Sequence, residues 1–293
     1  MTAMIALTVA LAVFVGIALG LLGGGGSIMT VPLLAYVAGM DAKQAIATSL
    51  LVVGVTSAVG AVSHARAGRV QWRTGLIFGA AGMAGAYAGG LLARFIPGTV
   101  LLIGFAVMMI ATAIAMLRGR KNVHAAGGAH RMPIPKIIAE GLVVGLVTGL
   151  VGAGGGFLVV PALALLGGLP MPVAVGTSLI VIAMKSFAGL AGYLSSVHID
   201  WGVALAVTAA AVVGALIGAR LTAMVDPDAL RKAFGWFVLG MSSIILAQEI
   251  HLAVGMAAAA LTAVALAMYL ACNRTGFCPL RHLVANRPAS APA

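Results

Sequence analysis

The chain has 293 residues, of which 62% are hydrophobic and only 8% are charged. This balance lies far outside that of an ordinary soluble domain and places most of the chain in a lipid bilayer. A formal net charge of +11 is compatible with a nucleic-acid-binding protein, but the basic residues lie at the ends of apolar segments and in the C-terminal tail. Such positions are typical of solvated loops, so we expect the bilayer, and no nucleic acid, as a partner.

Long apolar stretches predict the membrane helices in chain order. Residues 4–22, 75–92, 100–117, 202–221 and 252–271 reach or approach the roughly 20 residues that a helix needs to cross a bilayer. Strands of a membrane barrel are excluded by the length of these stretches and by their lack of polar alternation. We therefore expect an all-α polytopic membrane protein with about 8–10 transmembrane segments.

The chain repeats itself with a shift of 129 residues, the difference between Gly152 and Gly23. Residues 23–32 (GGGGSIMTVP) align with 152–161 (GAGGGFLVVP), and residues 45–50 (AIATSL) align with 174–179 (AVGTSL). A constant shift indicates that the two halves share one fold, and such repeats are typical of membrane transporters. We expect a first membrane repeat at 1–118, a basic cytoplasmic connector at 119–136, a second membrane repeat at 137–250, an extra C-terminal helix at 251–272 and a cytoplasmic tail at 273–293.

Loop charges predict that the two halves are inserted in opposite directions. The loop with Arg66, Arg69 and Arg73 carries three arginines, whereas its counterpart, residues 195–200, carries only the acid Asp200. Basic loops stay in the cytoplasm, so these two loops face opposite sides of the membrane. The halves then form an inverted repeat in the cell inner membrane, with a cytoplasmic C-terminus.

Two glycine-rich segments interrupt the apolar sequence at matching places and predict two short, Gly-broken helical hairpins. They contain Gly24, Gly25, Gly26 and Ser27 in the first half and Gly154, Gly155 and Gly156 in the second. Backbone amides left unpaired in such a break must be buried or line a cavity. Two helix N-termini brought together there would form an anion site near the middle of the membrane. Close helix packing at a tight turn is the alternative.

A Thr-Ser pair follows each hairpin, Thr48 with Ser49 and Thr177 with Ser178. We expect their hydroxyls to serve the same anion site. The alternative is that each hydroxyl only bonds its own helix backbone one turn back.

One cation breaks the symmetry of the repeat. Lys185 lies in the middle of an apolar segment where the first half has Thr56, and Ser186 next to it matches Ser57. A lysine at this depth is costly and usually faces the protein interior or a water-filled cavity, although a long side chain can also reach the membrane surface. Glu140 and Glu249 are expected near helix ends, so an anionic substrate is the expected partner of Lys185.

Few residues offer other chemistry. Neither half contains a nucleophile with a plausible base or a pair of carboxylates, so we expect no catalytic residues and no enzyme. The spacing of Cys272 and Cys278 fits neither a zinc site nor a redox pair, and we expect two free thiols. No metal site and no cofactor is expected.

Taken together, the hairpin sequences GLLGGGGSIMTVP and GLVGAGGGFLVVP, the two Ala-x-x-Thr-Ser-Leu segments and the stretch KSFAGLAGY at 185–193 resemble the TauE/SafE sulfite exporter family. The resemblance covers nearly the whole chain. It implies a polytopic inner-membrane permease for sulfite, sulfonates or related organosulfur anions, with its site at the same glycine and Thr-Ser positions. Ser27 in the first hairpin replaces the glycine found at Gly156, so the two half-sites are expected to differ.

We therefore interpret the chain as a transporter, most simply an exporter, of small anions that works by alternating access of two inverted repeats. Two alternatives remain: a passive anion channel and a membrane scaffold without transport. The sequence leaves open the coupling ion, import, and assembly into a homo-oligomer.

Overall fold

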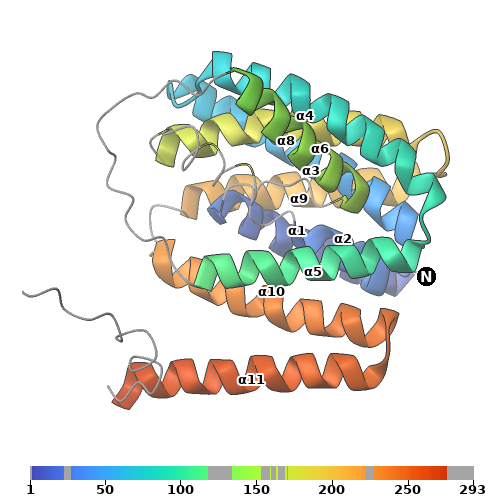
Figure 1. Ribbon diagram of the computed structural model, residues 1–293, viewed down its shortest axis with the longest axis vertical. Helices are drawn as coiled ribbons and strands as arrows, with labels where there is room; N and C mark the ends of the chain where they lie inside the picture. The colour runs from blue at the N-terminus through green and yellow to red at the C-terminus, as the bar shows by residue number, and fades with distance from the viewer. Residues whose placement is uncertain are drawn as a thin grey trace, which may run out of the picture.

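In a computed structural model of the chain, the elements run side by side as a bundle of helices (Figure 1). The structure describes residues 2–22, 28–117, 134–152, 159, 163, 169, 171–221 and 227–275. The first half contains α1 (Thr2–Leu22), α2 (Thr30–Pro32), η2 (Leu33–Val37), α3 (Ala42–Arg66), α4 (Trp72–Leu92), η3 (Ala93–Phe95) and α5 (Gly98–Leu117). The second contains α6 (Ile134–Val151), α8 (Met171–Tyr193), α9 (Trp201–Leu221), α10 (Pro227–Glu249) and α11 (Leu252–Thr275).

Four of these helices are long and apolar enough to cross a membrane by themselves. They are Ala42–Arg66, Trp72–Phe95, Val173–Tyr193 and Trp201–Leu221, and shorter apolar helices lie at Ala6–Gly20, Gly98–Ile114, Ile137–Val151 and Leu252–Met268. No strand occurs among the described residues. The prediction of an all-α, multi-pass membrane protein is therefore confirmed.

Acidic caps define where the central helices begin. The carboxylate of Asp41 accepts the N–H of Lys43 at 3.3 Å and starts α3. Asp200 accepts the N–H groups of Gly202 and Val203, at 3.0 and 3.2 Å, and starts α9. Each carboxylate satisfies an amide that the first turn of a helix leaves unpaired.

The first helix of each half packs against the other half. Helix α1 packs against α9 of the second half, and α6 packs against α4 of the first half. Both contacts depend on glycine: a Cβ on Gly16 would overlap the carbonyl of Ala211, and a Cβ on Gly145 would overlap the carbonyl of Gly82. These two contacts are the same contact in the repeat, because Gly16 corresponds to Gly145 and Gly82 to Ala211. The packing is thus related by a pseudo-two-fold axis.

Helices α3 and α8 show the inversion directly. They are equivalent in the repeat, and they pack against each other in opposite directions: Gly54 faces the ring of Phe187, whereas Gly60 faces Leu179. Equivalent helices that touch and run antiparallel require a two-fold axis in the plane of the membrane. The predicted inverted repeat is confirmed.

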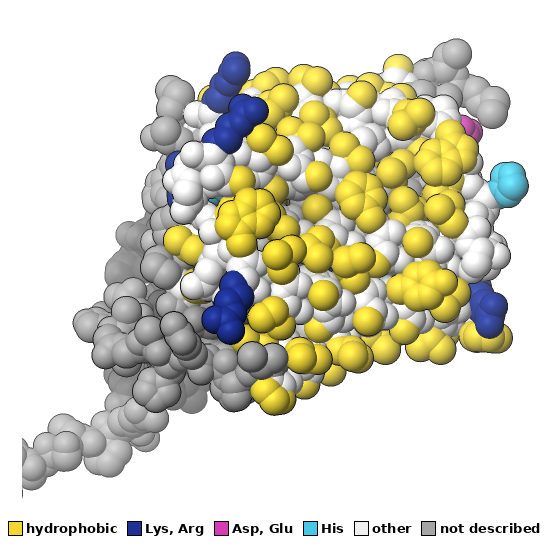
Figure 2. Space-filling view, turned by 90° about the horizontal axis from the view of Figure 1, so that it is seen from above, with side chains coloured by type: hydrophobic (Ala, Val, Ile, Leu, Met, Phe, Trp, Pro, Cys, Tyr) yellow, Lys and Arg dark blue, Asp and Glu magenta, His cyan; other side chains and the backbone are white. Residues whose placement is uncertain are grey.

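The two ends of the bundle differ in charge. One end, here called the arginine end, carries Arg66, Arg69, Arg73 and Arg220 at the termini of α3, α4 and α9. The opposite or acidic end carries Asp41, Asp200 and Glu249, together with Lys43 and Arg94. Apolar side chains cover the middle of the face in Figure 2, and Lys and Arg lie at its margins. This is the arrangement expected of a protein that crosses a bilayer.

Candidate functional site

Five buried polar side chains have no hydrogen-bond partner among the described residues. All are at most 1% exposed: Thr30, Thr48, Ser57, Lys185 and Ser186. A buried polar group normally has a partner, and a buried cation without one is costly. Four of the five, all except Thr30, were predicted as site residues from the sequence.

Ser57, Lys185 and Ser186 lie at the same depth, where α3 crosses α8. Because Gly54 is level with Phe187 and Gly60 with Leu179, Ser57 is level with the turn of α8 that precedes Lys185. This depth is near the middle of both helices. The structure thus places these three predicted residues at a similar depth, near the centre of the bundle.

Lys185 is directed inward. A Cβ on Gly82 would lie 3.9 Å from its Cβ and 4.0 Å from its Cδ, so its aliphatic stem lies along α4. Four residues earlier, Val181 packs in a cluster with Val159 and Leu163, and Lys185 continues that face of α8. Since its side chain is 1% exposed, Lys185 does not reach the surface of the protein. The alternative of a lysine that extends to the membrane surface does not fit this structure.

The counterpart of Lys185 behaves differently. The hydroxyl of Thr56 donates to the carbonyl oxygens of Val52 and Val53, at 2.7 and 3.1 Å, in its own helix. Thr56 therefore has its hydrogen-bonding need met locally. The central site is asymmetric, with one cation contributed by the second half.

The two Thr-Ser pairs do not share one site. Thr177 is level with residue 62 of α3, so it lies about 20 Å from Thr48 along the helix axes, at 1.5 Å per residue. Thr177 accepts the N–H of Gln71 at 2.9 Å at the arginine end, and Ser178 donates to Val175 at 2.8 Å. The expectation of a common site for Thr48, Ser49, Thr177 and Ser178 is thereby corrected.

Ser49 contacts the other half of the protein. Its hydroxyl donates to the carbonyl of Gly152 at 3.1 Å, just before the glycine segment of the second hairpin. Gly152 has a φ of +73°, and a Cβ there would overlap Ile46. Only glycine fits this position without strain. Ser49 is thus engaged in joining the halves, whereas Thr48 beside it is not.

Seven predicted glycine-segment residues lie outside the described residues: Gly24, Gly25, Gly26, Ser27, Gly154, Gly155 and Gly156. The expectation that both segments face each other across one central site therefore stays a prediction.

Thr30 was not predicted from the sequence, and Glu140 lies deeper than expected. Thr30 is buried and has no hydrogen-bond partner among the described residues. The sequence feature that could have indicated it is the replacement of this threonine by Val159 in the second half. Glu140 was placed near a helix end, yet it lies six residues into α6 with a buried carboxylate oxygen that has no described partner. Counting residues from the apolar segment alone placed Glu140 too close to solvent.

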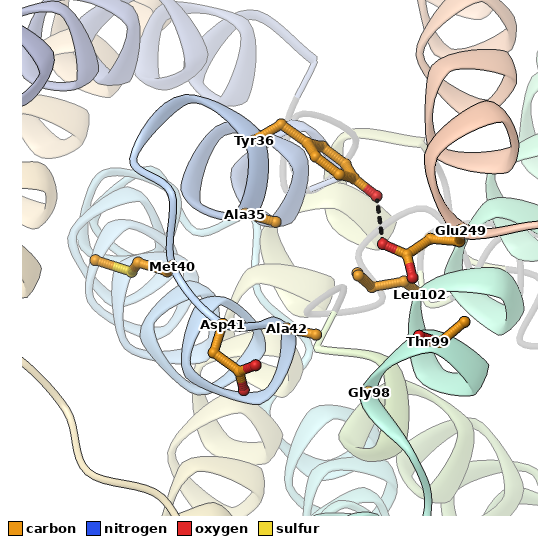
Figure 3. A pocket seen from close by; sticks show the side chains of 9 residues that line it. All are labelled: Ala35, Tyr36, Met40, Asp41, Ala42, Gly98, Thr99, Leu102 and Glu249. Atoms are coloured by element: carbon orange, nitrogen blue, oxygen red, sulfur yellow. Dashed lines mark hydrogen bonds between the residues drawn. The ribbon is translucent and has the colours of Figure 1, made fainter. Parts of the chain in front are cut away.

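A pocket of about 340 Å³ opens at the acidic end (Figure 3). The hydroxyl of Tyr36, on η2, points to Glu249 at the end of α10 and donates to its Oε1 at 3.2 Å. Asp41, Thr99 and Leu102 also line the pocket. None of the predicted site residues does, so this pocket is separate from the central lysine.

Comparison with known proteins decides the class of the molecule. The sequence profile described as "Sulfite exporter TauE/SafE" matches residues 8–245, which is most of the chain. The chain belongs to the TauE/SafE family. It is accordingly a member of a membrane transporter family, and the matched region includes both repeats and Lys185.

Curated relatives of this TauE/SafE protein are also described as transporters. A "Probable membrane transporter protein" of Xylella fastidiosa is 32% identical over 239 residues, which cover 79% of this chain and 91% of the relative. A "Probable membrane transporter protein YdhB" of Bacillus subtilis is 28% identical, with 74% and 90% covered. A relative with the same description in Methanocaldococcus jannaschii is 30% identical, with 64% and 72% covered. No solved structure matches.

Proposed function

We propose that this TauE/SafE protein exports small oxidised-sulfur anions, sulfite or a sulfonate, across the cell inner membrane. The observation that carries the proposal is Lys185, a fully buried cation at the centre of the bundle without a described partner. An anion that entered this site would supply the missing partner. The family description supports sulfite and related anions as the substrate class.

The orientation is part of the proposal. The arginine end faces the cytoplasm under the positive-inside rule, and the acidic end faces outward. Helix α11 starts at the acidic end, so the C-terminal tail that follows it is cytoplasmic.

The packing supports alternating access as the mechanism. Helices α1, α9 and α3 form one packed unit, in which α9 contacts both α1 and α3, and helices α6, α4 and α8 form the other. These units meet where α3 crosses α8, at the depth of Ser57 and Lys185. Rocking of one unit against the other about this crossing would expose Lys185 first to one side and then to the other.

Efflux from proteoliposomes tests the proposal. Vesicles loaded with radiolabelled sulfite or sulfoacetate are expected to lose the labelled anion through the purified protein in a saturable manner. Control vesicles loaded with radiolabelled choline, a cation, are expected to retain it. Saturation distinguishes a carrier from a passive channel, whose flux continues to rise with concentration. Absence of efflux for every sulfur oxyanion tested would contradict the proposed substrate class.

A further inference from the structure

Two further hydroxyls, on Thr30 and Thr48, stand out among the buried threonines. Four other buried threonines donate to the carbonyl of the residue four positions earlier in their own helix: Thr56, Thr112, Thr148 and Thr208. Thr30 and Thr48 are 1% and 0% exposed, and neither hydroxyl has a partner among the described residues. Both hydroxyls are therefore available to donate a hydrogen bond to a group outside their own helices.

These two hydroxyls lie at the same depth in neighbouring segments. Thr30 comes eight residues before Ala38, and Thr48 comes seven residues after Asp41, so the turn at 38–41 folds the two segments back on each other. Helix α2, which contains Thr30, packs against α3, which contains Thr48. Both threonines lie about 10–12 Å from this turn at 1.5 Å per residue. The turn belongs to the acidic end of the bundle.

The pair is separate from the central lysine. Lys185 is level with residue 56 of α3, so Thr48 lies about 12 Å closer to the acidic end than Lys185 does, at 1.5 Å per residue. The second half offers no equivalent pair, because Val159 replaces Thr30 and Thr177 is bonded to the N–H of Gln71.

We propose that Thr30 and Thr48 form an outer binding station for the substrate anion, occupied between Lys185 and release at the acidic end. Two neutral hydroxyls donate hydrogen bonds to an oxyanion without holding it as strongly as a buried cation does. A pathway needs such a weaker site, because a substrate must be able to leave as well as bind. This proposal rests on the proposed transport of anions.

Valine variants test the station. Thr30→Val and Thr48→Val replace each hydroxyl by a methyl group of similar size, and the second half already carries valine at the position of Thr30. A hydrogen bond to a charged group is worth enough that each variant is expected to raise the half-saturating anion concentration at the acidic face at least about ten-fold. The matched control is Thr208→Val, whose hydroxyl only bonds Ala204, at 2.6 Å. The station is overturned if Thr30→Val and Thr208→Val give the same half-saturating concentration in right-side-out vesicles.

A second measurement separates the station from the identity of the substrate. In a protein without its native cysteines, Thr30→Cys is expected to react with an anionic sulfonate-bearing thiosulfonate reagent, whereas Thr208→Cys is not. Reaction at Thr30→Cys in a protein that moves no sulfur oxyanion would retain the station and reject the proposed substrate. Equal lack of reaction at both positions would reject the station even in a protein that transports sulfite.

Discussion

Lys185→Met is expected to reduce anion flux at least about 100-fold, because removing one partner of a buried charge pair costs about 3–5 kcal/mol. Methionine keeps the length and the apolar stem of the side chain, which lies along Gly82, and removes only the charge. Initial rates of efflux from proteoliposomes containing equal amounts of protein measure the effect. Lys43→Met is the matched control, since the Nζ of Lys43 donates to the carbonyl of Arg94 at the acidic end, far from the centre.

The same variant is expected to be at least as stable as the wild type. A buried cation without a protein partner opposes folding, and an apolar side chain of similar volume removes this cost. Thermal unfolding in detergent without added anion measures the difference. Loss of stability together with unchanged flux would show that Lys185 serves the fold rather than the substrate.

Gly145→Ala is expected to destabilise the protein by about 2–3 kcal/mol, the upper range for overpacking of a tight interior. Its added methyl group would overlap the carbonyl of Gly82 and separate α6 from α4. Because the repeat places Gly16 against Ala211 in the same way, Gly16→Ala is expected to have an effect of similar size. The yield of monodisperse protein and its unfolding temperature are the measurements.

The controls for this variant are two other helical glycines. A methyl group added to Gly104 in α5 or to Gly240 in α10 would meet no described atom within 4 Å, so alanine is expected to be neutral or stabilising by up to about 1 kcal/mol. If all four alanine variants unfold at the same temperature, the packing of α1 against α9 and of α6 against α4 does not depend on close glycine contacts.

The inverted repeat could be predicted because two independent signals agreed. The constant shift between Gly23 and Gly152 showed two copies of one fold, and the arginines at 66, 69 and 73 against Asp200 gave their opposite directions. Burial of Lys185 followed from its position in the middle of an apolar helix. These inferences needed only composition, order and charge.

The packing partners could not be predicted in the same way. The repeat in the sequence is compatible with two arrangements: α1 packed within its own half, or α1 packed against α9 of the other half. The contact between Ser49 and Gly152 depends on that choice, so its hydroxyl was wrongly expected to be available. The error about Thr48 and Thr177 has a different source: in an inverted repeat, equivalent residues away from the crossing must lie on opposite sides of the membrane.

The central claim is that Lys185 binds the substrate anion, and a crystal structure with selenite tests it most directly. Selenite resembles sulfite, and selenium gives an anomalous signal that marks its position. We predict a selenium peak within hydrogen-bonding reach of the Lys185 Nζ, at the depth of Ser57 where α3 crosses α8. A bound selenium elsewhere, with the Lys185 Nζ bonded only to protein groups, would contradict the claim.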